Sequence, residues 1–134
     1  MFFRKKMTLL LFLTLMTFLT GCATIPQKEV DQKVALQKAA LEYWDLRMKD
    51  KYEDAYNMEY RQNLPPFNVY KNKAMMIKRM TVTSHSIKDV SIDGENAIVY
   101  VEFGFIMPPV STTLKQVIHD KWLLKDGRWW HIME

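Results

Sequence analysis

The spacing of the apolar residues changes once along this chain, near residue 80, and this change limits the folds that the chain can adopt. Between residues 31 and 80, apolar residues recur three, four and seven positions apart, which is typical of amphipathic helices. From residue 81 onward they alternate with polar residues, as in strands that bury one face. The sequence therefore predicts an α+β fold, in which helices come first and pack on a curved antiparallel sheet.

The helical pattern covers three segments, which span residues 31–48, 52–60 and 68–80. The apolar stripe of the first segment consists of Val34, Leu36, Ala40, Leu41, Tyr43, Trp44 and Met48. Pro65 and Pro66 end the second segment, because proline lacks a backbone donor and restricts the residue before it. We expect all three helices to cover the same face of the sheet.

Four strands are expected, and they span residues 81–92, 97–107, 110–125 and 128–133. They follow one another directly, so the sheet should be a four-stranded meander. The Asp-Gly pair at residues 126–127 is typical of a two-residue type I′ hairpin, which fixes the register of the last two strands. In this register Trp122 lies opposite His131, and Leu124 lies opposite Trp129.

The hairpin between the second and third expected strands has no turn motif, so its register has to be inferred from side-chain packing. We expect three pairs, which are Phe103 with Leu114, Val99 with Ile118 and, on the reverse face, Glu102 with Lys115. A bulge near Lys88 in the first strand would turn His85 and Ile87 toward the face that the helices cover.

The N-terminus has the layout of an export signal. Three basic residues at positions 4–6 precede an apolar run over residues 7–19. This run is shorter than the about 20 residues that a membrane-spanning helix needs. All 15 Asp and Glu residues follow this leader, so its removal lowers the formal charge from +4 to about +1. A near-neutral domain gives no reason to expect nucleic acid as a partner.

The apolar run ends in Leu-Thr-Gly-Cys, and its Cys22 is the only cysteine of the chain. This ending resembles the lipobox of bacterial lipoproteins. The resemblance implies a signal peptide at residues 1–21, and a lipidated Cys22 with a tether at residues 22–29. The partner of this segment would be the membrane, through the lipid on Cys22. Because Ala23 rather than Asp follows the cysteine, the implied destination is the outer membrane in a source with two membranes.

One face of the expected sheet is rich in aromatic residues. Its candidate ligand-binding residues are Phe103, Asp120, Trp122, Trp129 and His131. Asp120 should lie diagonally across the last hairpin from His131, within reach of a hydrogen bond. A carboxylate that orients an imidazole in a partly apolar cavity can make it a general base. The alternative is that both groups are solvated or merely satisfy each other.

The reverse face of the sheet holds Tyr100, Trp130 and Ile132, and it is more apolar than a solvated surface requires. We expect a partner here, either a second copy of the chain or another envelope protein; the alternative is ordinary scattered surface hydrophobes. No set of His, Cys and acidic residues has the spacing of a metal site, and there is no Gly-rich phosphate loop. We therefore expect no metal and no cofactor.

Two short motifs within this order of elements resemble the nuclear transport factor 2-like superfamily. They are residues 121–130, Lys-Trp-Leu-Leu-Lys-Asp-Gly-Arg-Trp-Trp, and the turn at residues 92–99, Ile-Asp-Gly-Glu-Asn-Ala-Ile-Val. The resemblance covers about residues 30–134 and implies one cone-shaped α+β domain. Fuller members insert a hairpin where this chain has only residues 61–67, so the resemblance implies a smaller or more open cavity.

Members of this superfamily include isomerases and dehydratases, which use an Asp or an Asp-His pair inside the cone, and also non-catalytic binding and assembly domains. The fold therefore does not settle the function. The leading hypothesis is a non-enzymatic envelope lipoprotein that binds a small hydrophobic ligand or a protein partner. The alternative is a cavity enzyme that uses Asp120 and His131, and a third hypothesis is a purely structural assembly factor with a filled cone.

Overall fold

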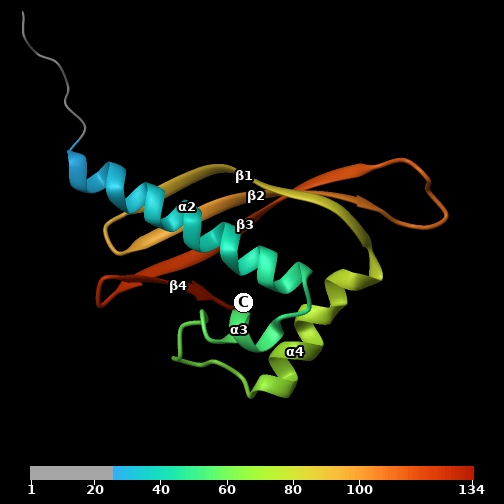
Figure 1. The fold of residues 1–134 in the computed structure, drawn as a ribbon, viewed down its shortest axis with the longest axis horizontal. Coiled ribbons are helices and arrows are strands. Elements are labelled where there is room, and N and C mark those ends of the chain that lie inside the picture. The colour runs from blue at the N-terminus through green and yellow to red at the C-terminus, as the bar shows by residue number, and fades with distance from the viewer. Residues whose placement is uncertain (1–25) are drawn as a thin grey trace, which may run out of the picture.

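The helices of this protein precede a single antiparallel sheet (Figure 1). The computed structural model describes residues 26–134, except for the side chains of residues 78 and 79. The elements are α2 (Gln27–Met48), α3 (Tyr52–Tyr56), α4 (Phe67–Met75), the short 3-10 helix η2 (Met76–Arg79), β1 (Thr81–Asp93), β2 (Asn96–Ile106), β3 (Leu114–Lys125) and β4 (Arg128–Ile132). The sheet order is β1-β2-β3-β4. The prediction of an α+β fold with three helices before a four-stranded meander is confirmed.

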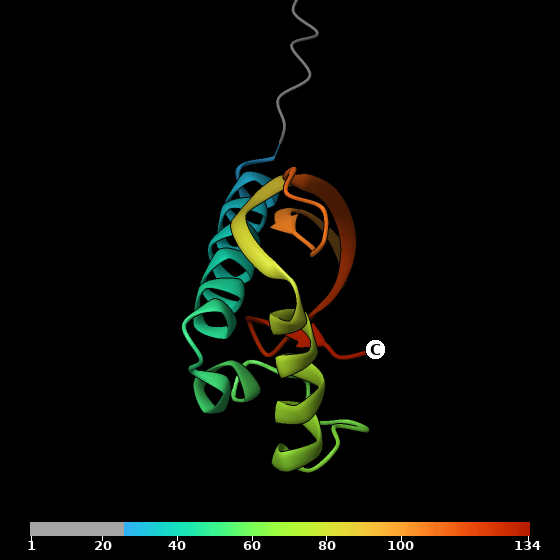
Figure 2. The same cartoon turned by 90° about the vertical axis from the view of Figure 1, so that its right-hand side faces the viewer.

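The sheet is strongly curved, and α2 runs along its concave side (Figure 2). α4 lies at one end of the curl, below the point where β1 begins. None of the helices in the described part of the chain is long and apolar enough to cross a membrane. The predicted signal peptide and Cys22 lie outside the described residues.

Helix α2 begins at Gln27, four residues before the predicted start, so it takes in the last three residues of the predicted tether. Its first turn follows Pro26 and is polar, with Gln27 Nε2 donating to Asp31 Oδ1 at 2.9 Å. An exposed polar turn contains no regularly spaced apolar residues. The spacing of apolar residues therefore did not predict this turn as part of the helix.

The buried face of α2 is narrower than the predicted stripe. Its buried residues are Leu36, Ala40, Tyr43 and Trp44. Val34 and Leu41 were expected on the same face, but they are 59% and 43% exposed. Only the side of α2 that carries Tyr43 and Trp44 packs on the sheet.

Helix α3 ends at Tyr56 rather than at the predicted residue 60, and the chain after it pairs with the outer edge of β4. The amide of His131 donates to the Met58 carbonyl at 2.9 Å, and the amide of Tyr60 donates to the His131 carbonyl at 2.8 Å. An edge strand presents unpaired backbone groups, and this segment satisfies two of them. Glu59 is thereby placed against His131.

The third helix is also shorter than predicted. α4 starts at Phe67, after Pro66, and ends at Met75, where η2 continues the chain to residue 79. The apolar positions that suggested one helix over residues 68–80 therefore belong to two helical segments of different pitch.

The register of the last hairpin is as predicted: Trp122 lies opposite His131, and Leu124 lies opposite Trp129. The preceding hairpin differs by two residues, so that Val99 faces Asp120 rather than Ile118. A shift of two keeps every side chain on its expected face. The predicted ion pair survives as a diagonal contact, with Lys115 Nζ 3.4 Å from Glu102 Oε1.

Strand β1 departs from regular pairing twice. One shift lies between Ile87 and Asp89, which confirms the predicted bulge near Lys88. It leaves His85 turned toward α2, where its Nε2 lies 2.7 Å from Asp45 Oδ1. A second shift, between Val82 and Ser84, was not predicted.

The core is built mainly from aromatic rings around Tyr43. Its ring lies 5.4 Å from that of Trp44, 5.9 Å from that of Trp122 and 4.1 Å from that of His131. All four side chains are buried. The interior around Tyr43 is thus filled by aromatic side chains.

Candidate functional site

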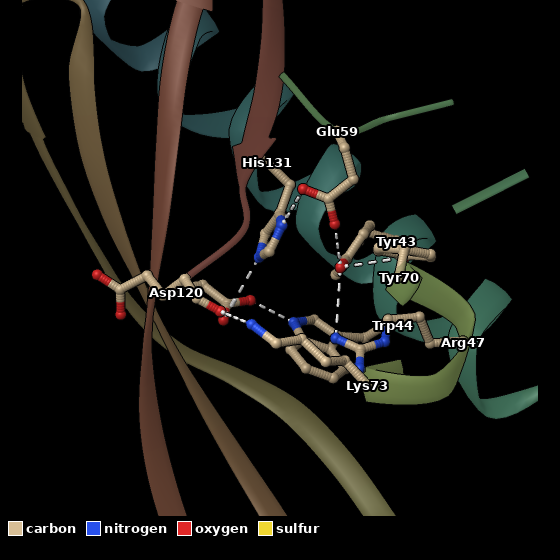
Figure 3. Close-up of polar contacts among 9 residues, drawn as sticks. Tyr43, Trp44, Arg47, Glu59, Tyr70, Lys73, Asp120 and His131 are labelled. Carbon is tan, nitrogen blue, oxygen red and sulfur yellow. Dashed lines mark hydrogen bonds and ion pairs between the residues drawn. The ribbon is translucent and has the colours of Figure 1, made fainter. Parts of the chain in front are cut away.

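A fully buried carboxylate, Glu59, joins the helices to the sheet. Tyr43 donates a hydrogen bond to Glu59 Oε1 at 2.6 Å, and His131 Nδ1 lies 2.8 Å from Glu59 Oε2 (Figure 3). A carboxylate only accepts, so the His131 nitrogen carries the proton. Tyr70 adds a further link, because its hydroxyl donates to that of Tyr43 at 3.3 Å.

The predicted pair of Asp120 and His131 is brought together in the interior. His131 Nε2 lies 3.8 Å from Asp120 Oδ1, which is ion-pair range but longer than the expected hydrogen bond. Asp120 receives its hydrogen bond instead from the indole N–H of Trp44. Figure 3 shows the imidazole between the two carboxylates, one from β3 and one from the segment after α3.

Burial alone would lower the pKa of His131, but Asp120 and Glu59 outweigh it and raise the pKa above its usual 6.5. Burial also raises the pKa of Tyr43, with the Glu59 carboxylate acting in the same direction. Both ring nitrogens therefore face a carboxylate, and these two neighbours favour the protonated form of the imidazole. A histidine whose two nitrogens both face carboxylates of the protein is poorly placed to take up a proton from a substrate.

An open cleft lies beside this network, at the end of the curl where α4 and η2 meet β1. Its larger part has a volume of about 480 Å³, and its smaller part has a volume of about 310 Å³. Both parts are lined by Arg47, Ala74 and Ile77. The smaller part reaches His131, whereas the larger part extends along β1 to His85. We refer to both parts together as the Ile77 cleft.

A narrow apolar cavity of about 80 Å³ opens from the same region toward the sheet. It shares Ile77, Met80 and Val82 with the larger part of the cleft, and it ends on Phe103 and Phe105. The lining of the Ile77 cleft therefore includes polar residues such as Arg47 and His85, and its inner side leads into an apolar cavity.

The predicted site residues do not share one cavity. Trp122 and Trp129 are buried in the core, with 1% and 5% of their surface exposed. Phe103 borders the narrow cavity, and His131 borders the smaller part of the Ile77 cleft. Asp120, at 7% exposure, lies behind His131.

The predicted partner residues alternate along β2 and β4 with buried residues, so they lie on the opposite, convex face. The helices α2 and α4 leave this face uncovered (Figure 2). Tyr100, Trp130 and Ile132 are half-buried by their own neighbours. The guanidinium of Arg128 lies 4.1 Å from the Trp130 ring centre, and the Trp130 indole donates to a main-chain carbonyl.

Three groups of the site were missed by sequence reasoning, namely Glu59, the Tyr43 hydroxyl and Arg47. Glu59 sits in a stretch that looked helical, and its burial depends on pairing with a strand 72 positions later. No local signal marks that pairing. The spacing of Tyr43 and Arg47, four apart on one helix, could have suggested that they interact.

Among residues 26–134, no group of three or more His, Cys or acidic side chains is arranged to hold a metal ion.

No protein-family model and no curated protein matches the chain. Among solved structures, the chain is similar to an NTF2-like transpeptidase from Campylobacter jejuni, with a TM-score of 0.41 and 16% sequence identity. The match covers 66% of this chain and 92% of that one.

Proposed function

We propose that this chain is an exported lipoprotein whose domain is a non-enzymatic binding module, and that the Ile77 cleft holds a small, largely apolar ligand. The observation that carries the proposal is the cleft itself, which opens beside the polar network of Tyr43 and His131. Both parts fall at or above the lower end of the about 300–1,000 Å³ that small-molecule sites occupy.

The state of the polar network supports a binding rather than a catalytic role. Asp120 and His131 are each only 7% exposed, and Trp44 and Glu59 already engage them. A general base needs an unoccupied atom within hydrogen-bond reach of its substrate. The alternative of an isomerase or dehydratase that uses this pair would require the network to open first.

Binding in the cleft can be tested with 1-octanol, an uncharged apolar probe. The full chain, carrying 13C-methyl methionine, is placed in phosphatidylcholine nanodiscs and followed by NMR. We expect saturable shifts of the Met48 and Met80 methyl signals, because both residues line the cleft. Met58 and Met107 line neither part and serve as internal controls. Shifts that are equal at all four methionines, or absent at all four, would rule out the cleft as the ligand site.

Attachment to the membrane through Cys22 is a separate part of the proposal, supported by the Leu-Thr-Gly-Cys ending of the apolar run. Cys22→Ala should leave an unprocessed precursor that carries no lipid. Mass spectrometry and membrane fractionation would follow this. A variant that is processed normally and remains lipid-modified would refute the anchor.

The convex face is a second candidate surface, for a protein partner or a second copy of the chain. What favours it is the absence of any covering helix among the described residues, together with Val117, which is 42% exposed on the same face as Tyr100 and Trp130. Crosslinking from a photoreactive residue at position 117 should capture one discrete product if this face docks a partner. A matched position on the exposed side of α2, such as Val34, provides the control.

A further inference from the structure

We propose that the ligand of the Ile77 cleft is an acid, a carboxylate on an apolar chain, and that Arg47 receives its carboxylate. This inference rests on the proposed function, because it names the chemistry of the ligand for the same cleft. The guanidinium of Arg47 is incompletely hydrogen-bonded within the protein.

Arg47 is held in place but is poorly satisfied. Its guanidinium carbon lies 4.6 Å from the Trp44 ring centre and 5.5 Å from that of Tyr43, so one face is covered by aromatic rings. Its Nη1 donates to the Tyr43 hydroxyl at 3.3 Å, which is a long bond to a neutral acceptor. Its Nε is buried and has no acceptor.

No carboxylate of the described residues forms an ion pair with Arg47, although such a residue usually has one when it leaves water. The nearest acid in the network, Glu59, is reached only through Tyr43, whose hydroxyl stands between the two. Glu59 and Asp120 are already occupied by Tyr43, His131 and Trp44. A buried donor without a partner calls for an explanation, and a bound anion is one of the usual ones.

The surroundings of Arg47 favour an anion in the cleft. Lys73 and His131 line the same smaller part, and the pKa of His131 is raised by its two acidic neighbours. Lys73 Nζ lies 3.2 Å from the main-chain oxygen of Glu134, so its hydrogen bond in the structure is to the backbone. The side-chain carboxylate of Glu134, which also borders the cleft, is paired with Lys121. Figure 3 shows Arg47 and Lys73 on the same side of the network.

The other walls of the cleft define the rest of the ligand. Met48, Ala74, Ile77, Met80 and Val82 give the larger part an apolar wall, and the narrow cavity continues it toward Phe103. A planar carboxylate matches the fork of a guanidinium through two parallel hydrogen bonds. A carboxylic acid with an acyl chain therefore matches both the Arg47 guanidinium and the apolar wall of the cleft.

Two probes of equal length separate the charge from the chain. Octanoate and 1-octanol are titrated into the full chain in phosphatidylcholine nanodiscs at neutral pH, and the Met48 and Met80 methyl signals report occupancy of the cleft. We expect octanoate to bind about tenfold more tightly than octanol, as a charged hydrogen bond to a guanidinium implies. Acetate, which has the charge without the chain, should produce no saturable shift at these two methyls.

Substitutions then test whether the preference for octanoate over octanol depends on Arg47. In Arg47→Gln the advantage of octanoate over octanol should fall to about onefold, while octanol binding remains. Arg61→Gln is the matched control, because Arg61 is exposed, lies over the Tyr56 ring and lines neither part of the cleft. In Ile77→Ala both probes should bind more weakly by a similar factor, because Ile77 contacts the chain rather than the charge.

The possible results distinguish an acidic ligand from an uncharged apolar ligand in the same cleft. Equal affinity for octanoate and octanol in the unmodified chain would overturn the acid but leave the apolar ligand standing, and this comparison needs no variant to fold. Failure of both probes would overturn both proposals. An unchanged octanoate preference in Arg47→Gln would show that Arg47 serves only to balance the charge of the buried network.

Discussion

The Tyr43 hydroxyl donates a 2.6 Å hydrogen bond to a carboxylate, that of Glu59, which has no surface exposed to solvent. This contact ties α2 to the segment that pairs with β4. A buried carboxylate that loses a donor carries the full cost of its lost hydration, since water cannot replace the missing group.

Tyr43→Phe should therefore destabilise the protein by about 2–3 kcal/mol in urea unfolding. Tyr56→Phe is the control, because its hydroxyl donates to the Pro65 carbonyl at a half-buried site that water can reach. We expect the control to lose no more than about 1 kcal/mol. Equal losses in the two variants would contradict a special role for the Glu59 contact.

Two buried tryptophans provide a similar comparison. The indole N–H of Trp44 donates to Asp120, whereas the indole N–H of Trp122 is buried without a partner. Replacing either by Phe removes a similar volume, but only Trp44→Phe leaves a carboxylate without its donor. Trp44→Phe should cost about 1–3 kcal/mol more than Trp122→Phe in the free energy of unfolding. A larger loss for Trp122→Phe would argue against the Trp44 to Asp120 contact.

The raised pKa of His131 predicts a stability that depends on pH. The unfolded chain releases this proton near pH 6.5, whereas the folded chain keeps it to higher pH. The contribution of the His131 proton to the free energy of unfolding is fully present below pH 6.5. It is lost as the pH rises through the raised pKa of His131, with a slope of up to about 1.4 kcal/mol per pH unit.

Urea unfolding between about pH 6 and about pH 9 would measure this loss. His131→Gln should remove it, and His119→Gln, at an exposed position on the convex face, should retain it. Because His131→Gln can also weaken the fold, NMR titration of the His131 ring in the unmodified chain gives a second test. A ring that titrates below pH 6.5 would contradict the prediction.

Gly104 lies where the unpredicted shift in β1 brings Ser84 opposite it. A Cβ at this position would stand 2.5 Å from Ser84 Oγ and 3.2 Å from Thr83 Oγ1. Gly104→Ala should cost about 1–3 kcal/mol, the usual effect of overpacking. Ser84→Ala should recover part of that loss in the double variant, whereas it should not recover the loss of Gly94→Ala, where strain comes from a φ of +61°.

Local sequence signals predicted the parts of the fold that local chemistry decides. The Asp126-Gly127 turn allowed the β3–β4 register to be predicted in full, because a two-residue hairpin has only one pairing. The β2–β3 register was wrong by two because residues 107–113 contain no such turn, and packing alone chose between pairings that keep the same face.

The site was less predictable than the fold. Asp120 and His131 were correctly expected to be neighbours, since both belong to that last hairpin. Glu59 was not, because its burial follows from the end of α3 and from pairing with a distant strand edge. The cleft could not be predicted either, because the α4 to η2 change of pitch that positions Ile77 depends on tertiary packing.

The pairing of residues 58–60 with β4 also affects how these molecules behave toward one another. A sheet edge with free amides and carbonyls recruits strands from neighbouring molecules. Here the chain itself caps β4 at His131, and the edge strand on the other side, β1, is interrupted by two register shifts. We expect both features to weaken edge-to-edge pairing between molecules at high local concentration.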